Sequence, residues 1–180
     1  DQAAETGMPT LIELREEGVL GAVGLGMNQS AMPADFVRRF DVDVVMIAGR
    51  FTLIEQPAMH DLLPLALERG VGVVAAGVYN SGLLSADVVR PDANYDYGPA
   101  PRALIERAML IAEICARYGV TLPAAALQFP LRHPAVVSVV VGTRSAAHIT
   151  SSIERYSADI PNELWSELMA AGIFAGPDAS

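Results

Sequence analysis

A short segment near the C-terminal end has the residue types of an anion-binding site. Gly142, Thr143, Arg144 and Ser145 lead from a valine-rich run into a helical pattern. The first turn of a helix presents free backbone N–H groups and a positive dipole, and both suit a phosphate. Arg144 favours an anion, but Thr143 or Ser145 also fits a plain helix cap, so these residues alone leave both interpretations open.

A second segment has the composition of a ligand-binding turn. It consists of Tyr79, Asn80, Ser81, Gly82 and Leu83, and it follows another valine-rich run. A small, glycine-bearing turn at a strand end can bring its backbone close to a ligand, although such turns are common. Asn28 follows an earlier apolar run, and its amide can both donate to and accept from a carboxamide.

No residues form a recognisable catalytic or metal-binding pattern. His60, His133 and His148 share no metal-ligand spacing, and we expect surface or capping groups. No serine has a histidine and a carboxylate at motif spacing. Cys115 lies in an apolar helical pattern, which favours a small core residue over a reactive thiol. We assign no catalytic residue and no metal to this chain.

Strands that alternate with helices must position these segments. Short, uninterrupted, valine-rich runs are typical of strands buried in parallel sheets. The expected strands are Val19–Leu25, Val42–Ile47, Val71–Ala76 and Val136–Val141. Ala146–Tyr156 is expected to form a helix that covers the fourth strand, and Asn162 is expected to cap a final helix. The expected helices are Thr10–Glu17, Ala34–Phe40, Met59–Arg69, Arg102–Tyr118, Thr121–Arg132, Ala146–Tyr156 and Asn162–Ala171. Residues 80–101 are expected to form a polar loop.

This alternation predicts an α/β fold with a parallel sheet. Ligands bind beyond the carboxyl ends of parallel strands, so Asn28, Ala48, Tyr79 and Thr143 are expected at one end of strands that follow chain order. A (β/α)8 barrel needs about 250 residues, so four such units would make half a barrel with two unpaired strand edges. A doubly wound sheet is also compatible with the alternation.

Composition narrows the function further. The 180 residues are 52% hydrophobic, which indicates one globular domain over residues 1–180. The net charge of −9 argues against a nucleic-acid partner, and no apolar run reaches the roughly 20 residues that span a membrane. A lone cysteine suits a reducing cytoplasm. The N-terminus has neither a Met nor the pattern of a signal peptide, so we expect a piece of a longer chain.

The segments at the strand ends resemble the aldo/keto reductase superfamily over essentially the whole chain. Leu11–Gly18 with Ala22–Asn28 resembles the helix and fifth strand of that family, and Gly142–Ile149 resembles its eighth strand and phosphate-binding helix. The resemblance implies the C-terminal half of a (β/α)8 TIM barrel, strands 5–8, and an NAD(P) site. The implied cofactor-binding residues are Asn28, Tyr79, Asn80, Ser81, Gly82, Leu83, Gly142, Thr143, Arg144, Ser145, His148 and Ser152.

A narrower resemblance is to the L-fucose and D-threo-aldose 1-dehydrogenase group. It is carried by Ala48–Gln56, Tyr79–Leu84, Leu127–Pro134 and Ile160–Trp165. It implies oxidation of the anomeric carbon of an aldose such as L-fucose to a lactone, with hydride transfer to NAD or NADP. Pyridoxal 4-dehydrogenase is similar and is a rival assignment.

Two departures from the family pattern bear on activity. Ala48 stands where many members have a glutamine that contacts the nicotinamide carboxamide. The family's Asp, Tyr, Lys and His tetrad lies on the first four βα units and matches nothing here. We therefore expect this chain alone to be inactive, with general acid–base catalysis supplied by a missing N-terminal half-barrel.

Two other functions stay open: a non-catalytic nucleotide-binding half-barrel that pairs with itself or with another chain, and the phosphate-binding half of an unrelated (β/α)8 isomerase. The resemblance also bears on the cofactor. Family members that favour NADP commonly place a lysine and an arginine at positions that match Gly142 and His148. Neither is a cation at neutral pH, so we expect NAD to be tolerated or preferred, with Arg144 as the remaining positive charge.

Overall fold

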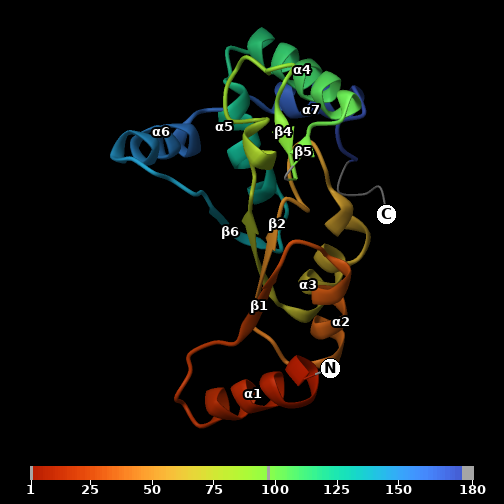
Figure 1. The fold of residues 1–180 in the computed structure, drawn as a ribbon, viewed down its shortest axis with the longest axis vertical. Coiled ribbons are helices and arrows are strands. Elements are labelled where there is room, and N and C mark those ends of the chain that lie inside the picture. Colours follow the sequence, from red (N-terminus) through yellow and green to blue (C-terminus); the bar gives the residue numbers. More distant parts are fainter. Residues whose placement is uncertain (1, 97, 176–180) are drawn as a thin grey trace.

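A four-stranded parallel sheet lies at the centre of the computed structural model, which describes residues 2–96 and 98–175 (Figure 1). Its strands are β1 (Gly24–Met27), β2 (Val44–Ala48), β3 (Gly72–Ala76) and β6 (Val136–Val140), and they pair in the order β1-β2-β3-β6. Every neighbouring pair is parallel. The prediction of four parallel strands in chain order is confirmed.

Helices surround the strands on one side and at both ends. Figure 1 shows α2 and α3 along one side of the sheet, α4, α5 and α7 beyond one end, and α1 beyond the other. The helices are α1 (Met8–Glu16), α2 (Ala31–Arg39), α3 (Leu62–Arg69), α4 (Arg102–Arg117), α5 (Leu122–Gln128), α6 (Ala146–Ser157) and α7 (Asn162–Ala170). Shorter elements are η1 (Ala3–Gly7), η2 (Pro57–His60), η3 (Asn80–Gly82), η4 (Phe129–Arg132), and the hairpin of β4 (Asn94–Tyr95) and β5 (Gly98–Pro99).

The two faces of the sheet differ in burial. Val45, Ile47, Val73 and Ala75 are at most 1% exposed, on the face covered by helices. The residues that alternate with them are half-buried or exposed, because strand side chains point to opposite faces in turn. We call this second surface the open face; it consists of Gly26, Met46, Val74 and Ser138 in one row across the sheet and Ala48, Ala76 and Val140 in the next.

The first strand begins at Gly24 and not at Val19, so this predicted boundary is wrong. Gly18 closes α1 with a φ of 76°, and the amide of Val19 donates to the carbonyl of Leu14 at 2.9 Å. The backbone of Val19 is therefore used to end the helix, and its side chain is 65% exposed. The valine run predicted a strand where the chain forms a helix-ending turn.

Two predicted helices are each divided in the structure. Thr121–Arg132 becomes α5 and the 3-10 turn η4, consistent with Pro130 lacking an N–H to donate to the preceding turn. Met59–Arg69 becomes η2 and α3. Asp61 starts α3, because its carboxylate accepts a hydrogen bond from the amide of Leu62 at 2.6 Å.

Three further details correct the expectations from sequence. Asn162 does not cap α7, because the cap position falls on Pro161 and no side-chain bond closes that end. The segment 80–101 is not only a loop, since it contains η3 and the β4–β5 hairpin. Helix α6 does not cover the fourth strand: it has no buried residue and stands off β6.

Gln128 provides a physical reason for the position of α6. Its Nε2 atom donates to the carbonyls of Arg155 and Ala158, both at 2.8 Å, and so ties the C-terminal end of the helix to α5. The segment that leads into the other end, residues 142–145, is exposed. The helix is therefore held at one end only.

No single helix in the described ranges is long and apolar enough to cross a membrane. Helix α4 together with Leu122–Arg132 meets the length and composition only as a pair bent by 101°.

A carboxylate fastens the start of β1 to β2. Asp43 Oδ2 accepts a hydrogen bond from the amide of Val23 at 2.7 Å and another from Arg15 Nη1 at 2.7 Å. The amide of Asp43 donates in turn to the carbonyl of Val23 at 2.8 Å. The Val23 amide, and after it the Arg15 guanidinium, lower the pKa of Asp43 below its ordinary value.

We expect replacement of Gly24 by alanine to weaken the β1–β2 pair. A Cβ at Gly24 would overlap the carbonyl oxygen of Val44, whereas one at Gly26 would lie 3.8 Å from Met46 Cβ in ordinary contact. Gly24→Ala should lower the free energy of unfolding by about 1–3 kcal/mol, and the matched control Gly26→Ala should change it by less than about 0.5 kcal/mol. Urea titrations followed by circular dichroism measure both, and equal losses would contradict the close approach at Gly24.

The Asp43 cluster should make stability depend on pH. Because the pKa of Asp43 is lower in the folded chain than in the unfolded chain, its contribution is present above the unfolded pKa and is lost as the pH falls through the folded pKa. Asp43→Asn should therefore be less stable than the wild type at neutral pH, and this difference should shrink toward about pH 3. Urea titrations at the two pH values test this, and a constant difference would count against it.

Candidate functional site

The carboxyl ends of the four strands bring the predicted site segments to one end of the sheet. Asn28 follows β1, Ala48 ends β2, Tyr79 follows β3 and Thr143 follows β6. Because all four strands are parallel, these residues share one end, as the alternation of strands and helices predicts. This confirms the expected placement of the segments.

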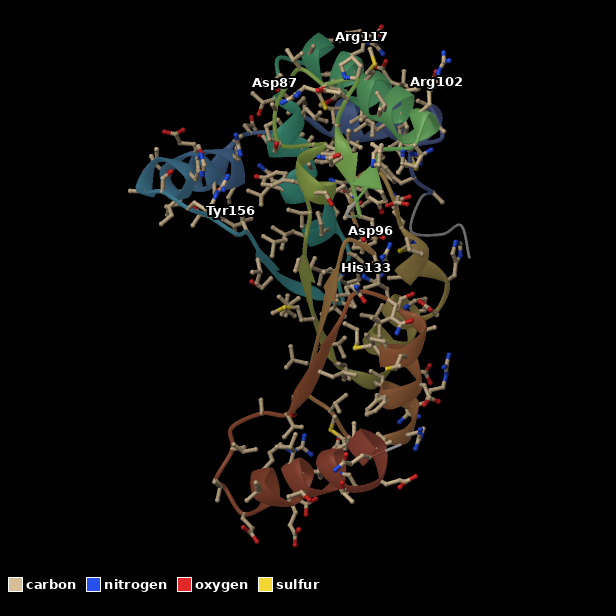
Figure 2. All side chains as sticks on the ribbon, in the orientation of Figure 1. Asp87, Asp96, Arg102, Arg117, His133 and Tyr156 are labelled. Atoms are coloured by element: carbon tan, nitrogen blue, oxygen red, sulfur yellow. The ribbon has the colours of Figure 1, made fainter. Side chains whose placement is uncertain are left out.

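Arg50 joins the loops that follow β1 and β2. Its Nε atom donates to the backbone carbonyl of Asn28 at 2.5 Å, and its Nη2 atom lies 3.7 Å from Asp96 Oδ2. Figure 2 shows Asp96 beyond the strand ends. The carbonyl of Asn28 is thus held in place, while its exposed amide side chain has no hydrogen-bond partner in the described part of the chain. That amide is available to a ligand.

The turn after β3 contains consecutive residues in the left-handed backbone region. The φ angles of Asn80, Ser81 and Gly82 are 47°, 57° and 96°. The amides of Gly82 and Leu84 both donate to the carbonyl of Tyr79, at 3.0 and 3.1 Å. The turn is closed by its own backbone, and such geometry in non-glycine residues is typical of functional segments.

The five predicted residues of this turn differ in accessibility. Ser81 and Gly82 are exposed and Tyr79 is half-buried. Asn80 and Leu83 are each 3% exposed, so their side chains belong to the interior. A ligand at this turn would contact the backbone and the exposed members.

Glu55 lies at the centre of a polar cluster that sequence reasoning missed. Its carboxylate accepts a short hydrogen bond from the Tyr95 hydroxyl and one from Asn80 Nδ2 at 3.4 Å. Asn80 Oδ1 is buried and has no hydrogen-bond partner among the described residues. The available signal was that Glu55 directly follows the mostly apolar segment Phe51–Ile54. Its partner Tyr95 lies 40 residues further along the chain, so the sequence alone does not pair the two.

The cluster keeps the Tyr95 phenol protonated. Burial, and after it the hydrogen bond to Glu55, raise the pKa of Tyr95 above its ordinary value. The nearby Arg50 opposes this shift. The hydroxyl is therefore a hydrogen-bond donor that is already engaged, and it is not a free proton-transfer group.

The segment that leads into α6 combines a satisfied cap with free donors. Ser145 Oγ accepts from the amide of His148 at 3.3 Å, so the capping interpretation is confirmed. Thr143 Oγ1 donates to the carbonyl of Ser145 at 3.0 Å. Arg144 is exposed and has no ion-pair partner in the described ranges. The cap and an anion site are compatible, because a cap uses only one of the free amides at a helix start.

The two predicted ligand-binding segments, residues 79–83 and 142–145, lie at opposite ends of α6. Arg155, near its C-terminal end, donates to the Tyr79 hydroxyl at 3.4 Å and places its guanidinium 5.6 Å from the centre of the Tyr79 ring. Ser145 caps the N-terminal end, about 15 Å along the helix axis from Arg155. Ser152 lies between them, half-buried, with its Oγ donating to the carbonyl of His148 at 2.8 Å.

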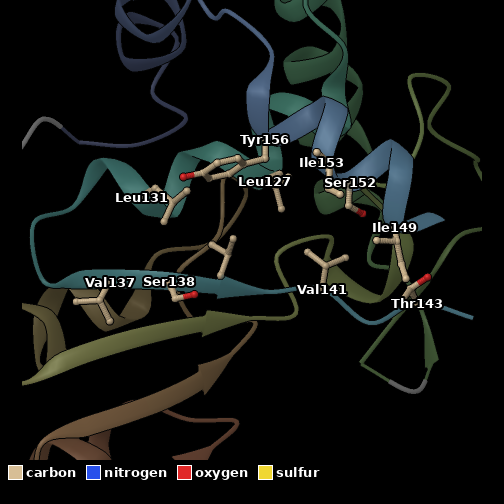
Figure 3. A pocket seen from close by; sticks show the side chains of 11 residues that line it. Leu127, Leu131, Val137, Ser138, Val141, Thr143, Ile149, Ser152, Ile153 and Tyr156 are labelled. Atoms are coloured by element: carbon tan, nitrogen blue, oxygen red, sulfur yellow. The ribbon is translucent and has the colours of Figure 1, made fainter. Parts of the chain in front are cut away.

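An apolar cleft separates α6 from β6 (Figure 3). Its volume is about 370 Å³, and its helix side is lined by Ile149, Ile153 and Tyr156. These three side chains are 51–60% exposed. The strand side carries Val139 and Val141. Ser152 and Thr143 contribute hydroxyl groups to its lining.

The remaining candidates for chemistry have structural roles. Cys115 is fully buried, and burial raises the pKa of its thiol to about 12, so it is a core residue as expected. His133 Nδ1 accepts from the amide of Ala135 at 3.2 Å, and burial lowers the pKa of this histidine. No group of three or more His, Cys, Asp or Glu residues that could hold a metal occurs in the described part of the chain.

Two proteins of known structure illustrate the similarity of fold. An aldo-keto reductase from Bacillus halodurans, in its holo form, aligns with a TM-score of 0.73 and 21% identity over 91% of this chain and 54% of its own. The glycerol dehydrogenase of Gluconobacter oxydans aligns with a TM-score of 0.71 and 17% identity over 100% of this chain and 58% of its own. At these identities the likeness shows the fold alone.

Sequence relatives are closer. D-threo-aldose 1-dehydrogenase from a Pseudomonas species is 44% identical over 177 residues, which are 98% of this chain and 54% of the relative. Pyridoxal 4-dehydrogenase from Microbacterium luteolum is 39% identical over 169 residues, which are 94% of this chain and 49% of the relative. The chain spans about half the length of these relatives.

The sequence pattern of the aldo/keto reductase family matches residues 2–173, which is nearly the whole chain. The site segments at the strand ends lie within this match. Together with the parallel sheet and the fold of the solved relatives, the match shows that this chain belongs to the aldo/keto reductase family.

Proposed function

We propose that this chain forms the C-terminal half of a (β/α)8 barrel in an NAD(P)-dependent dehydrogenase of the cytoplasm. The proposed reaction is oxidation of the anomeric carbon of an aldose, such as L-fucose, to a lactone. The observation that carries the proposal is the 44% identity to an aldose 1-dehydrogenase over 98% of the chain. Four parallel strands, half the number in a (β/α)8 barrel, support the architecture.

The described residues fit a dinucleotide at three points. Ser145 Oγ accepts a hydrogen bond from the amide of His148. The amides of Ala146 and Ala147, in the same first turn of α6, are left for a phosphate. The guanidinium of Arg144 adds a two-point donor for the same anion. The amide side chain of Asn28 is exposed and matches a carboxamide. When bound, the nicotinamide accepts the hydride that leaves the substrate.

The chain's own contribution is to bind and orient. Arg50 fixes the loop of Asn28 through its carbonyl, and the Glu55–Tyr95 pair fixes the hairpin that lies over η3. Tyr95 is engaged by Glu55 and Cys115 is buried, so we assign proton transfer to a segment that precedes this chain. Oxidation of a hydroxyl needs a base for its proton, and that base should come from the other half of the barrel.

A second candidate is oxidation of pyridoxal at its 4-position. The 39% identity to pyridoxal 4-dehydrogenase favours it. The two substrates differ in shape and polarity, and the strand-end residues described here do not select between them. Parallel assays with L-fucose and pyridoxal decide between the two.

We expect the 180-residue chain to show no dehydrogenase activity, and an extended form with the upstream half of its reading frame to reduce NAD in the presence of L-fucose. The physical reason is the missing proton-transfer group. Reduced nicotinamide is measured by its absorbance. Turnover by the short chain would contradict the division of roles, and inactivity of a folded long form on both aldose and pyridoxal would contradict the proposed activity.

The cofactor preference should respond to two positions on the α6 segment. Gly142→Lys with His148→Arg replaces a glycine and a histidine with two permanently charged side chains, and it should strengthen NADP binding by at least about tenfold with little effect on NAD. Thr150→Lys, an exposed change on the same helix, is the control for general charge. Titration of the extended form with both cofactors measures the effect. If the wild type already binds NADP about a hundredfold more tightly than NAD, the NAD preference is wrong.

A further inference from the structure

We propose that Glu55 is a positioning residue of the cofactor site. Its carboxylate holds the turn after β3 in the backbone conformation that exposes Ser81 and Gly82, and it acts through the side chain of Asn80. The inference rests on the proposed function, because it concerns how this chain holds NAD or NADP. Glu55 is not among the residues that the sequence predicts to bind the cofactor.

The turn after β3 needs support from outside its own backbone. Asn80 and Ser81 are consecutive non-glycine residues with φ angles of 47° and 57°. Asparagine adopts the left-handed backbone region as a single residue, and a run of two non-glycine residues persists there only where the surroundings fix it. The contacts of the Asn80 and Ser81 side chains therefore decide whether the turn keeps this form.

Glu55 supplies this support at Asn80. The side chain of Asn80 is buried, and its Nδ2 atom donates to Glu55 Oε2 at 3.4 Å. A carboxylate oxygen only accepts, so this bond fixes which way the amide faces. The other amide atom, Asn80 Oδ1, is buried without a partner among the described residues. If Glu55 were removed, both ends of a buried amide would be unpaired, and release of the Asn80 side chain from the interior would be favoured.

The backbone of Glu55 is itself held in place. The amide of Thr52 donates to the carbonyl of Glu55 at 2.8 Å, and the amide of Glu55 donates to Thr52 Oγ1 at 3.1 Å. Thr52 is fully buried, and its neighbours Phe51, Leu53 and Ile54 are at most 4% exposed. The carboxylate therefore projects from a fixed turn that follows β2. A group that positions another residue needs such a rigid support.

The β4–β5 hairpin extends the support from Glu55 to Ser81. The hydroxyl of Tyr95 donates to Glu55 Oε2, the same oxygen that Asn80 uses. The amide of the next residue, Asp96, donates to Ser81 Oγ at 3.2 Å. Glu55 thus holds one left-handed residue directly and the other through the hairpin. Both of these donors to Glu55 are neutral and share one oxygen, so the oxygen is essential for the arrangement and the negative charge is not.

Hydrogen exchange of the 180-residue chain tests the support of the turn without any cofactor. Glu55→Met removes the oxygen at similar side-chain length, and Glu55→Gln keeps one oxygen. The amides of Gly82 and Leu84, which donate to the carbonyl of Tyr79, should exchange at least about tenfold faster in Glu55→Met and less than about threefold faster in Glu55→Gln. The amides of Gly72–Ala76 in β3 are the internal reference. Unchanged turn amides, or an equal acceleration in β3, would overturn the proposal.

Cofactor titration of the extended form tests the consequence for binding. The dissociation constant for NAD should rise at least about tenfold in Glu55→Met and stay within about threefold of the wild type in Glu55→Gln. Glu68→Met, at an exposed position on α3, is the matched control and should bind as the wild type does. Circular dichroism checks that each variant is folded. A folded Glu55→Met with unchanged affinity, or equal losses in Glu55→Met and Glu55→Gln, would contradict a positioning role of this oxygen.

The two measurements separate this inference from the proposed function. If the extended wild type binds neither NAD nor NADP, the proposed function is wrong, and the exchange result alone decides whether Glu55 holds the turn. If Glu55→Met does not fold, Tyr95→Phe takes its place in both measurements, because it removes only the hairpin's bond to the same oxygen. Tyr95→Phe should then accelerate turn exchange and weaken NAD binding by at least about threefold each, and no change in either would overturn the proposal.

Discussion

Parallel pairing between neighbouring strands is the constraint on which the rest of this structure depends. Each strand must return to the same end of the sheet, so a helix or long loop has to cross from every carboxyl end to the next amino end. The segments that leave the carboxyl ends therefore gather at one place. Asn28, Arg50, Tyr79 and Thr143 come from four separate parts of the sequence and share that end for this reason alone.

The same constraint explains why the polar contacts concentrate there. Backbone that leaves a strand loses its ladder partners, and side chains take over the bonding. Arg50 bonds the carbonyl of Asn28, and Glu55 holds both Asn80 and Tyr95. At the opposite end of the sheet, the carboxylate of Asp43 accepts a hydrogen bond from the backbone amide of Val23. The sheet is thus fastened at both ends by ionisable groups, while its middle depends on apolar packing.

Sequence reasoning recovered what depends on local pattern. Valine-rich runs placed three of the four strands to within two residues at each end. The spacing in α4 predicts an inward stripe of Leu104, Ala108, Ile111 and Cys115, of which the last three are fully buried and Leu104 is half-buried. Sequence reasoning failed at Val19, whose backbone is captured by Leu14 although its residue type favours a strand. Propensity describes a residue, and this boundary is decided by a hydrogen bond.

Contacts between distant residues were beyond reach for a different reason. Glu55 and Tyr95 are hydrogen-bonded although an irregular loop separates them in the sequence. Hydrophobic periodicity does not predict the course of such a loop, so the only sequence signal for this cluster was a glutamate beside an apolar run. The position of α6 is similar. The amphipathic pattern of α6 predicts that it packs on a strand. Gln128 instead holds the C-terminal end of α6 against α5, and a cleft separates the helix from β6.

The order of the strands along the chain also has a consequence for synthesis. β1, β2 and β3 are consecutive in both sequence and space, so each can pair as soon as it leaves the ribosome, at small loop-closure cost. β6 cannot join until residues 77–135 have been made. Throughout that interval the outer edge of β3 has no strand beside it, and Gly72–Ala76 is then open to pairing with a neighbouring chain. The time taken to translate residues 77–135 therefore sets how long this edge stays without its β6 neighbour.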